Sequence, residues 1–218
     1  MNTKAVLFDL DGTLADTALD LGLALNNLLI KHGKPTFTME KLRPLASHGS
    51  SAFVQLGFGF TPDDPRFTQT KLDYLAEYEH CFNQQTVLFD GVNELISALQ
   101  EKGLIWGIIT NKPKAFTDRL VQKLNFIIPP HVVVSGDTTS EAKPSIKPML
   151  YACEQINVKP EQCIYVGDAQ RDIVAGKNAG MKTVLANWGY IAENDAPHTW
   201  GADVQIDHPL ALLSSCFE

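Results

Sequence analysis

The chain has 218 residues, which is long enough for one large domain or for a domain that carries a smaller insertion. A hydrophobic content of 44% and a charged content of 20% are typical of a soluble globular protein, and no apolar run approaches the roughly 20 residues of a membrane-spanning helix. The formal net charge of −7 argues against a nucleic-acid partner, and the lack of a long apolar run argues against a membrane. A metal ion is the expected reason for clustered acids in such a chain.

Short apolar segments, rich in β-branched residues, alternate with longer helical patterns along most of the chain. The segments predict strands at 4–10, 104–110, 131–137, 162–168, 182–187 and 202–207. The first is a continuous apolar run, as expected of a strand buried on both faces. This alternation is typical of a parallel sheet with crossover helices, so we predict an α/β fold with a Rossmann-like core.

One region interrupts the alternation. Residues 16–85 contain helical patterns and no convincing strand. A helix is expected over 16–33, with a cap at Asp16 or Thr17, and a second apolar helical face is expected within 64–83. We therefore predict two domains, an α/β core formed by 1–15 and 86–218 and a helical insertion formed by 16–85.

The tetrapeptide "VLFD" occurs twice, at residues 6–9 and 87–90. The first copy continues into a second aspartate, Asp11, whereas the second copy continues into "GVNELI". We interpret the second copy as the return of the chain to the core domain, with Asp90 as a turn or cap residue before a helix. Four shared residues do not establish an internal repeat.

Polar residues stand at the ends of the first four predicted strands, namely Asp9, Thr110, Ser135 and Asp168. Ligands of such sheets bind at the carboxyl ends of the strands, so we expect these side chains to converge. In "DLDGT", Asp9 and Asp11 lie two residues apart and Gly12 allows a sharp turn. Two carboxylates this close repel each other unless a cation or a proton lies between them.

A second pair of acids lies in "VGDAQRDIVAGKNAG". Asp168 ends a strand and Asp172 falls in the first turn of the next helix, where negative charge is favoured. Helix capping alone is an alternative explanation of this pair. Combined with Asp9 and Asp11, however, the pair supplies the hard oxygen ligands of a Mg²⁺ site that keeps positions for water and a phosphate.

Cationic and hydroxyl groups follow the other strands. The Thr110 hydroxyl and the backbone N–H groups after it are candidates for binding phosphate oxygens, and Asn111 and Lys112 are candidate substrate-binding residues there. Lys143 comes first after the third strand and is the candidate for neutralising charge on a transferred phosphoryl group. Lys147 is expected to be a solvated surface residue.

The motifs "DLDGT", Thr110, Lys143 and "GDxxxD" at 167–172 resemble, in order, the four motifs of the haloacid dehalogenase superfamily. The resemblance covers essentially the whole chain, and the insertion after the first motif resembles a type 1 cap. It implies that Asp9 is the nucleophile that becomes an aspartyl phosphate. It also implies that Asp11 is the general acid and then the general base, and that Thr110 and Lys143 bind phosphate and align the nucleophile.

The resemblance further implies a Mg²⁺ ion held by Asp9, the main-chain carbonyl of Asp11, and Asp168, with Asp172 supporting that shell. A carboxylate nucleophile divides one difficult displacement into two easier steps, and a second acid can give and later take the proton. Superfamily members that cleave carbon–halogen bonds lack the second acid. Asp11 therefore favours phosphoryl chemistry over dehalogenation.

Within the superfamily the chain resembles the phosphoglycolate phosphatase group, and "LIWGIITNKP" with "GYIAENDAPHTWGADVQIDHP" resembles bacterial N-acetylmuramic acid 6-phosphate phosphatases of cell-wall recycling. Both substrates add a carboxylate to a phosphate. Arg43, His48, Ser50 and Ser51 in the predicted cap are candidates for orienting such a substrate and excluding water, although they also fit a polar surface loop.

Two other classes remain as alternatives to a phosphatase. A phosphomutase would use the same four motifs and return the phosphate to a sugar. A receiver-like phospho-acceptor module would need an aspartate at the third strand, where this chain has Ser135.

The cysteines, Cys81, Cys153, Cys163 and Cys216, lack metal-like or scaffold-like spacing. We expect free thiols, a cytoplasmic location without a signal peptide, and a monomer or homodimer.

Overall fold

The computed structural model describes residues 3–217, which form two compact units. The core unit comprises the chain up to Ala15 and from Leu88 onward, and the inserted unit comprises Asp16–Val87. The two short strands at the crossings, β2 (Ala15–Asp16) and β3 (Val87–Leu88), pair with each other. The chain therefore leaves and re-enters the core unit through adjacent backbone segments.

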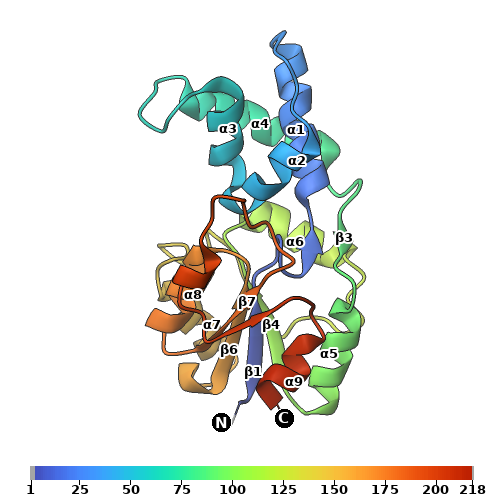
Figure 1. Ribbon diagram of the computed structural model, residues 1–218, viewed down its shortest axis with the longest axis vertical. Helices are drawn as coiled ribbons and strands as arrows, with labels where there is room; N and C mark the ends of the chain where they lie inside the picture. The colour runs from blue at the N-terminus through green and yellow to red at the C-terminus, as the bar shows by residue number, and fades with distance from the viewer. Residues whose placement is uncertain (1–2, 218) are drawn as a thin grey trace. The chain divides into compact units, whose positions relative to one another are not determined.

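A six-stranded parallel sheet organises the core unit, which confirms the predicted α/β class (Figure 1). The strands are β1 (Ala5–Phe8), β4 (Ile105–Ile109), β5 (Val132–Val134), β6 (Cys163–Gly167), β7 (Lys182–Ala186) and β8 (Val204–Ile206). Their order is β5-β4-β1-β6-β7-β8, so β1 lies inside the sheet between β4 and β6. Each strand lies within its predicted segment and is shorter than it.

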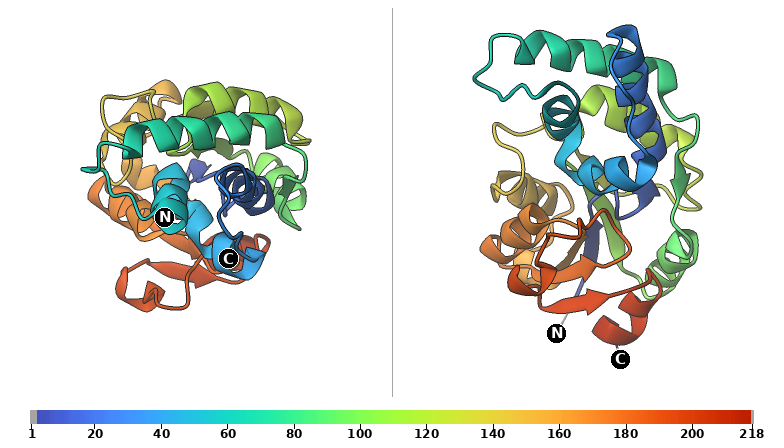
Figure 2. Two further views of the ribbon diagram at one scale, coloured as in Figure 1. Left: turned by 90° about the horizontal axis from the view of Figure 1, so that it is seen from above. Right: turned by 45° about the horizontal axis from the view of Figure 1, so that its top comes forward.

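Helices cover both faces of this sheet (Figures 1 and 2). They are α5 (Val92–Glu101), α6 (Lys114–Lys123), α7 (Lys147–Gln155), α8 (Gln170–Asn178) and α9 (Ala211–Phe217), with short 3₁₀ turns η2 (Pro160–Gln162) and η3 (Pro197–Thr199). In Figure 1 and in the right-hand view of Figure 2, α5 and α9 lie on one side of the sheet, and α7 and α8 lie on the other. The strand order runs in opposite directions on the two sides of β1, and the covering helices change from one face of the sheet to the other there. In sheets with such a switch point, ligands bind at the carboxyl ends of the central strands.

The strands are apolar on both faces because both faces are covered. Under α7, the side chains of Leu7, Ile109 and Met149 belong to one buried apolar cluster. Phe8 meets the ring of Trp106 edge-on at a centroid distance of 6.4 Å, and both side chains are buried. The continuous apolar run of the first strand is therefore explained by two cores, one on each face.

The inserted unit is helical. It contains α1 (Ala18–Lys31), α2 (Met39–Leu42), the 3₁₀ segment η1 (Arg43–His48), α3 (Gly49–Phe58) and α4 (Phe67–Cys81). The ring of Tyr74 stacks on that of Phe53 at 5.5 Å, and its hydroxyl donates a hydrogen bond to the Leu21 carbonyl at 3.0 Å. These contacts join α1, α3 and α4 in one small core.

The structure confirms Asp90 as a turn residue rather than a helix cap, and it confirms Thr17 at the N-cap position of the first helix. Gly91, rather than Asp90, occupies the N-cap position of α5, and Asp90 lies in the turn before it, 3.6 Å from the imidazole of His208. Thr17 stands at the N-cap of α1, but its side chain makes no capping hydrogen bond there. Instead, the carboxylate of Asp16 accepts a long bond of 3.4 Å from the Ala18 N–H.

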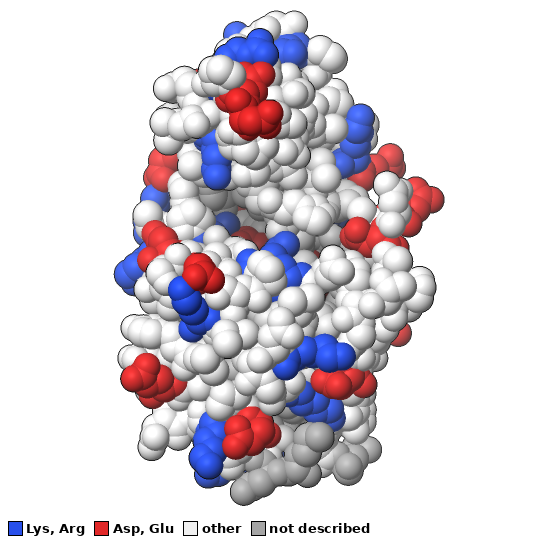
Figure 3. Space-filling view, turned by 90° about the vertical axis from the view of Figure 1, so that its left-hand side faces the viewer, with Lys and Arg blue, Asp and Glu red and all other residues white. Residues whose placement is uncertain are grey.

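Surface charge is mixed. On the face shown in Figure 3, Lys and Arg side chains are interspersed with Asp and Glu side chains, so positive charge does not gather in one stripe there. Among the described residues, no helix is both long enough and apolar enough to cross a bilayer.

Asp20 joins the two ends of the inserted unit and is fully buried. Its carboxylate accepts hydrogen bonds from the Gln85 N–H at 2.9 Å, the Thr86 N–H at 3.1 Å and the Thr86 hydroxyl. Asp20→Ala removes a charged acceptor from three donors, and we expect it to lower the free energy of unfolding by about 2 kcal/mol. Urea denaturation measures this loss. The control, Asp63→Asn, alters an exposed acid of the same unit and should change stability by less than about 0.5 kcal/mol; equal losses in both variants would contradict the role of Asp20.

Candidate active site

The candidate site is built at the carboxyl edge of the sheet. Phe8 at the end of β1 pairs with Ile108 of β4 and with Val166 of β6. Because the three strands are parallel and in this register, the residues that follow them come to the same edge: Asp9 after β1, Thr110 after β4 and Asp168 after β6. The hydrophobic pairing of the strands thus fixes the position of the polar residues.

Three carboxylates gather at this edge. Asp9, Asp168 and Asp172 each offer one oxygen, and the three oxygens lie within 4.8 Å of one another. All three side chains are buried. Burial raises the pKa of Asp9 above its ordinary value, the ammonium of Lys143 lowers it, and the neighbouring charge of Asp172 raises it again. A cluster of this kind fits a hard divalent cation such as Mg²⁺, which prefers carboxylate oxygens.

The side chain of Asp11 is not part of that cluster. It remains partly exposed, and its Oδ1 accepts a hydrogen bond of 3.0 Å from the buried ammonium of Lys112. Asp11 therefore has a carboxylate that a substrate can reach and a cation that fixes its orientation. The resemblance assigns the main-chain carbonyl of Asp11, not its side chain, to the metal ion. That assignment stays a prediction.

Lys143 is the central cation of the site. Its ammonium lies 2.9 Å from Asp9 Oδ1 and 2.8 Å from Asp172 Oδ1, and it also donates to the Tyr165 hydroxyl at 2.7 Å and the Ile109 carbonyl at 2.8 Å. The side chain is completely buried. Lys147, by contrast, is exposed at the start of α7 and pairs with Glu141, as expected of a surface lysine.

The two residues after β4 serve different purposes. Thr110 is buried, and its hydroxyl accepts a hydrogen bond of 3.2 Å from the Lys112 N–H. Asn111 holds the backbone of Lys143 from both sides, because its amide donates to the Lys143 carbonyl at 2.9 Å and its Oδ1 accepts from the Lys143 N–H at 3.0 Å. The Asn111 side chain thus positions Lys143, and a role for Asn111 in binding substrate stays a prediction.

Asp168 is held by groups that the sequence analysis did not identify. The Thr13 hydroxyl donates to its Oδ1 at 3.2 Å, and the Tyr190 N–H donates to its Oδ2 at 2.9 Å. Tyr165 was also missed; its hydroxyl donates to the Ile109 carbonyl at 2.7 Å while it accepts from Lys143. Tyrosine and threonine are frequent in buried cores, so nothing in the local sequence distinguishes these residues.

Glycines make room for the carboxylate of Asp168. A Cβ on Gly12, whose φ is +86°, would lie 2.3 Å from Asp168 Oδ2, and a Cβ on Gly189 would lie 2.1 Å from Asp168 Cβ. Both distances are far shorter than any real contact. Glycine is thus required at position 12 of "DLDGT", because the backbone there has a positive φ and because Asp168 packs against it.

The remaining candidates, Arg43 and His48, belong to the inserted unit. The guanidinium of Arg43 forms an ion pair of 2.7 Å with Asp16, and His48 is exposed at the end of η1. Arg43 is therefore anchored to a residue at the start of its own unit. A role for either side chain in binding substrate stays a prediction.

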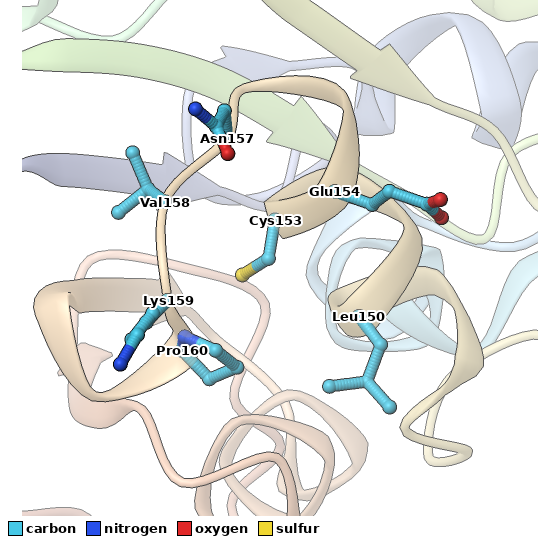
Figure 4. Close-up of a pocket in the computed structure, with 7 residues that line it drawn as sticks. All are labelled: Leu150, Cys153, Glu154, Asn157, Val158, Lys159 and Pro160. Atoms are coloured by element: carbon cyan, nitrogen blue, oxygen red, sulfur yellow. The ribbon is translucent and has the colours of Figure 1, made fainter.

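A surface pocket of about 330 Å³ lies apart from these residues (Figure 4). It is lined by the second half of α7 and by the segment that leads to Pro160, before β6 begins at Cys163. Asp168 follows the other end of β6, so the pocket lies toward the opposite edge of the sheet. None of the candidate site residues lines it.

Comparison with known proteins agrees with this arrangement. The model of a family described as haloacid dehalogenase-like hydrolase matches residues 6–186, and the chain belongs to that family. It is 40% identical over 217 residues to an N-acetylmuramic acid 6-phosphate phosphatase of Pseudomonas aeruginosa, which covers 98% of this chain and 94% of that protein. It is also 40% identical over 209 residues to a phosphoglycolate phosphatase of Xanthomonas campestris, covering 96% and 94%.

A solved structure shows the same fold over the whole chain. The crystal structure of a predicted phosphoglycolate phosphatase from Haemophilus somnus superposes with a TM-score of 0.86 at 25% identity, and the match covers 99% of this chain and 98% of that one. The superfamily and the fold class expected from the four motifs are thereby confirmed.

Gly189→Ala tests whether Asp168 belongs to a metal site. The added methyl group would overlap Asp168 and displace its carboxylate, so we expect Mg²⁺ affinity to fall at least tenfold. Isothermal titration calorimetry measures the affinity. In the control, Gly22→Ala, the new Cβ meets the ends of the Met39 and Leu42 side chains and no residue of the acid cluster, so Mg²⁺ binding should not change. An unchanged affinity in Gly189→Ala, with the fold retained, would remove Asp168 from the metal site.

Proposed function

We propose that the protein is a Mg²⁺-dependent phosphomonoesterase that acts on a small anionic phosphate ester through an aspartyl-phosphate intermediate. The observation that carries this proposal is the position of Asp9, a buried carboxylate in contact with Lys143 and next to a cluster of acids that fits a divalent cation. Family membership and two relatives named as phosphatases support it.

Asp9 has the geometry of an oriented nucleophile. Its Oδ1 accepts a hydrogen bond of 2.8 Å from the Leu10 N–H and lies 2.9 Å from the Lys143 ammonium. These two contacts fix the plane of the carboxylate and leave Oδ2 without a donor of that quality. We propose that Asp9 attacks the phosphorus atom and that Lys143 stabilises the charge on the phosphoryl oxygens.

Asp11 is suited to move the proton. Unlike Asp9, it is partly exposed, and Lys112 holds its Oδ1. In the first step Asp11 would give a proton to the leaving oxygen of the ester. In the second step the same carboxylate would take a proton from the water that attacks the aspartyl phosphate, and it would return to its starting state.

Asp9, Asp168 and Asp172 would hold the Mg²⁺ ion, together with the main-chain carbonyl of Asp11. When bound, the ion supplies positive charge that neutralises the phosphate oxygens and allows an anion to approach the carboxylate nucleophile. Thr110 follows β4 at the same edge and is proposed to bind the phosphate, with Lys112 as a second contact.

We propose phosphoglycolate or N-acetylmuramic acid 6-phosphate as the substrate, because relatives that are 40% identical over nearly the whole chain are named for these two activities. Both esters carry a carboxylate in addition to the phosphate. We propose that the inserted unit is the cap that recognises this part of the substrate, with Arg43 and His48 as contributors. The cytoplasmic location and the oligomeric state, monomer or homodimer, also stay predictions.

Asp9→Asn tests the nucleophile. The amide is nearly the same size but is not a nucleophile, so we expect the rate of phosphate release from p-nitrophenyl phosphate to fall by about three orders of magnitude or more. Circular dichroism checks that the fold is retained. Asp118→Asn, at a surface acid that pairs with Lys114, is the matched control and should keep full activity. Substantial activity in Asp9→Asn would end the assignment of Asp9.

A panel of phosphate esters tests the substrate and the reaction class. We expect kcat/KM to be at least tenfold higher for phosphoglycolate or N-acetylmuramic acid 6-phosphate than for neutral-sugar phosphates, and we expect stoichiometric free phosphate in each case. Phosphate release is measured colorimetrically and sugar products by mass spectrometry. Isomerised sugar phosphate without net release would show a phosphomutase instead, and turnover of neither carboxylated ester would exclude both proposed substrates.

A further inference from the structure

Arg171 lies beside the acid cluster in a position that local structure does not explain. It is the second residue of α8, directly before Asp172. The amino end of a helix carries partial positive charge, which favours Asp172 and disfavours a cation. An arginine at this position therefore makes the helix less stable than an uncharged or acidic polar residue would.

The contacts of Arg171 leave some of its donors unused. Its terminal nitrogen lies 3.8 Å from Asp9 Oδ2, which is an ion pair but too long for a hydrogen bond. Its Nε is buried and has no hydrogen-bond partner within residues 3–217. The side chain is 19% exposed. A buried N–H without a partner costs free energy unless a ligand satisfies it.

Lys143 lies close enough to stabilise phosphoryl charge, as proposed above, but its N–H groups already have partners, so it does not offer a further hydrogen bond to a phosphate oxygen. Its ammonium already faces Asp9, Asp172, the Tyr165 hydroxyl and the Ile109 carbonyl, and its side chain is not exposed. Of the two cations in contact with Asp9, Arg171 is the one whose side chain is partly exposed, and its buried Nε is the donor that lacks a partner among the described residues. A planar guanidinium also matches two phosphate oxygens at once, which an ammonium does not.

The formal charges favour the same conclusion. Three carboxylates and the two cations Lys143 and Arg171 leave the cluster with one negative charge, and a divalent metal ion would turn this into one positive charge. Without Arg171 the metal-loaded cluster would be neutral and would not attract a phosphate dianion. With Arg171, the metal-loaded cluster has a net positive charge, which attracts a negatively charged phosphate ester.

We propose that Arg171 is a substrate-binding residue that holds two non-bridging oxygens of the phosphoryl group as it meets Asp9. This inference rests on the proposed phosphatase function. The ligand chemistry is that of a phosphate monoester, inorganic phosphate or a transition-state mimic such as orthovanadate. Binding through Nε and a terminal nitrogen satisfies the buried donor and adds charge where the transferred group develops it.

Three variants test the role of Arg171. Arg171→Met removes the donors and the charge, Arg171→Lys keeps only the charge, and Lys177→Met removes an exposed cation six residues further along α8 as the matched control. Orthovanadate inhibition and calorimetric binding of inorganic phosphate are measured at saturating Mg²⁺, and Mg²⁺ affinity is measured separately. Circular dichroism and the melting temperature check the fold of each variant.

We expect Arg171→Met to weaken vanadate and phosphate binding 10- to 100-fold, with Arg171→Lys intermediate and Lys177→Met unchanged. Mg²⁺ should bind Arg171→Met as tightly as wild type or more tightly, because a cation beside the ligands has been removed. A merely structural role would give the opposite pattern, with weaker Mg²⁺ binding and wild-type vanadate binding once Mg²⁺ is saturating, and would overturn the inference.

The two proposals fail in different ways. If the wild-type protein hydrolyses phosphate esters and binds vanadate while Arg171→Met binds it equally well, only the role of Arg171 is wrong. If the wild-type protein neither hydrolyses any ester nor binds vanadate, the phosphatase function is wrong and this inference falls with it. If Arg171→Met does not fold, Arg171→Lys decides, and vanadate binding equal to wild type in that variant overturns the two-oxygen contact.

Discussion

The site depends on the ion pairs that Lys143 makes inside the acid cluster. Asp9 and Asp172 are buried, and carboxylates taken out of water are stable only when they are paired or protonated. Lys143 lies within 3 Å of both, and the Tyr165 hydroxyl and the Ile109 carbonyl also lie within hydrogen-bond distance of its ammonium, so its three N–H groups all have partners. One buried ammonium therefore opposes the rise that burial causes in the pKa of Asp9, and it holds Asp9 and Asp172 together in a cluster that fits a divalent ion.

The loop that carries Lys143 is itself held by Asn111, which follows β4. This couples two of the strand ends at the site through a pair of side-chain-to-backbone hydrogen bonds. Asp168 is coupled in the same manner to Thr13 and Tyr190, which lie far from it in the sequence. The reacting groups are thus positioned by a second layer of hydrogen bonds from the core unit, as the chemistry requires.

Much of this arrangement was predictable, because its causes are local. Continuous apolar runs between helical patterns predict buried parallel strands, and the parallel arrangement brings Asp9, Thr110 and Asp168 to one edge. The remainder depends on packing between distant segments. Nothing near Tyr165 in the sequence indicates its contact with Lys143. Asn111 is polar, as a substrate-binding residue would be, but its side chain bonds to the backbone of Lys143. Arg171 stands between the two acids of "GDxxxD" at a position that the motif leaves variable, so the motif does not predict its role.

The repeated tetrapeptide shows how completely context decides the role of a residue. In the first copy, residues 6–9, the apolar side chains lie in the middle of the sheet and are nearly inaccessible, so the strand delivers Asp9 into a buried cluster. In the second copy Val87 is 59% exposed, and Asp90 extends into solvent near His208. The same four letters place one carboxylate beside Lys143 and the other in water. Asp9 has the surroundings that the proposed nucleophile needs because β4 and β6 bury it and the loop after β5 supplies its cation, Lys143.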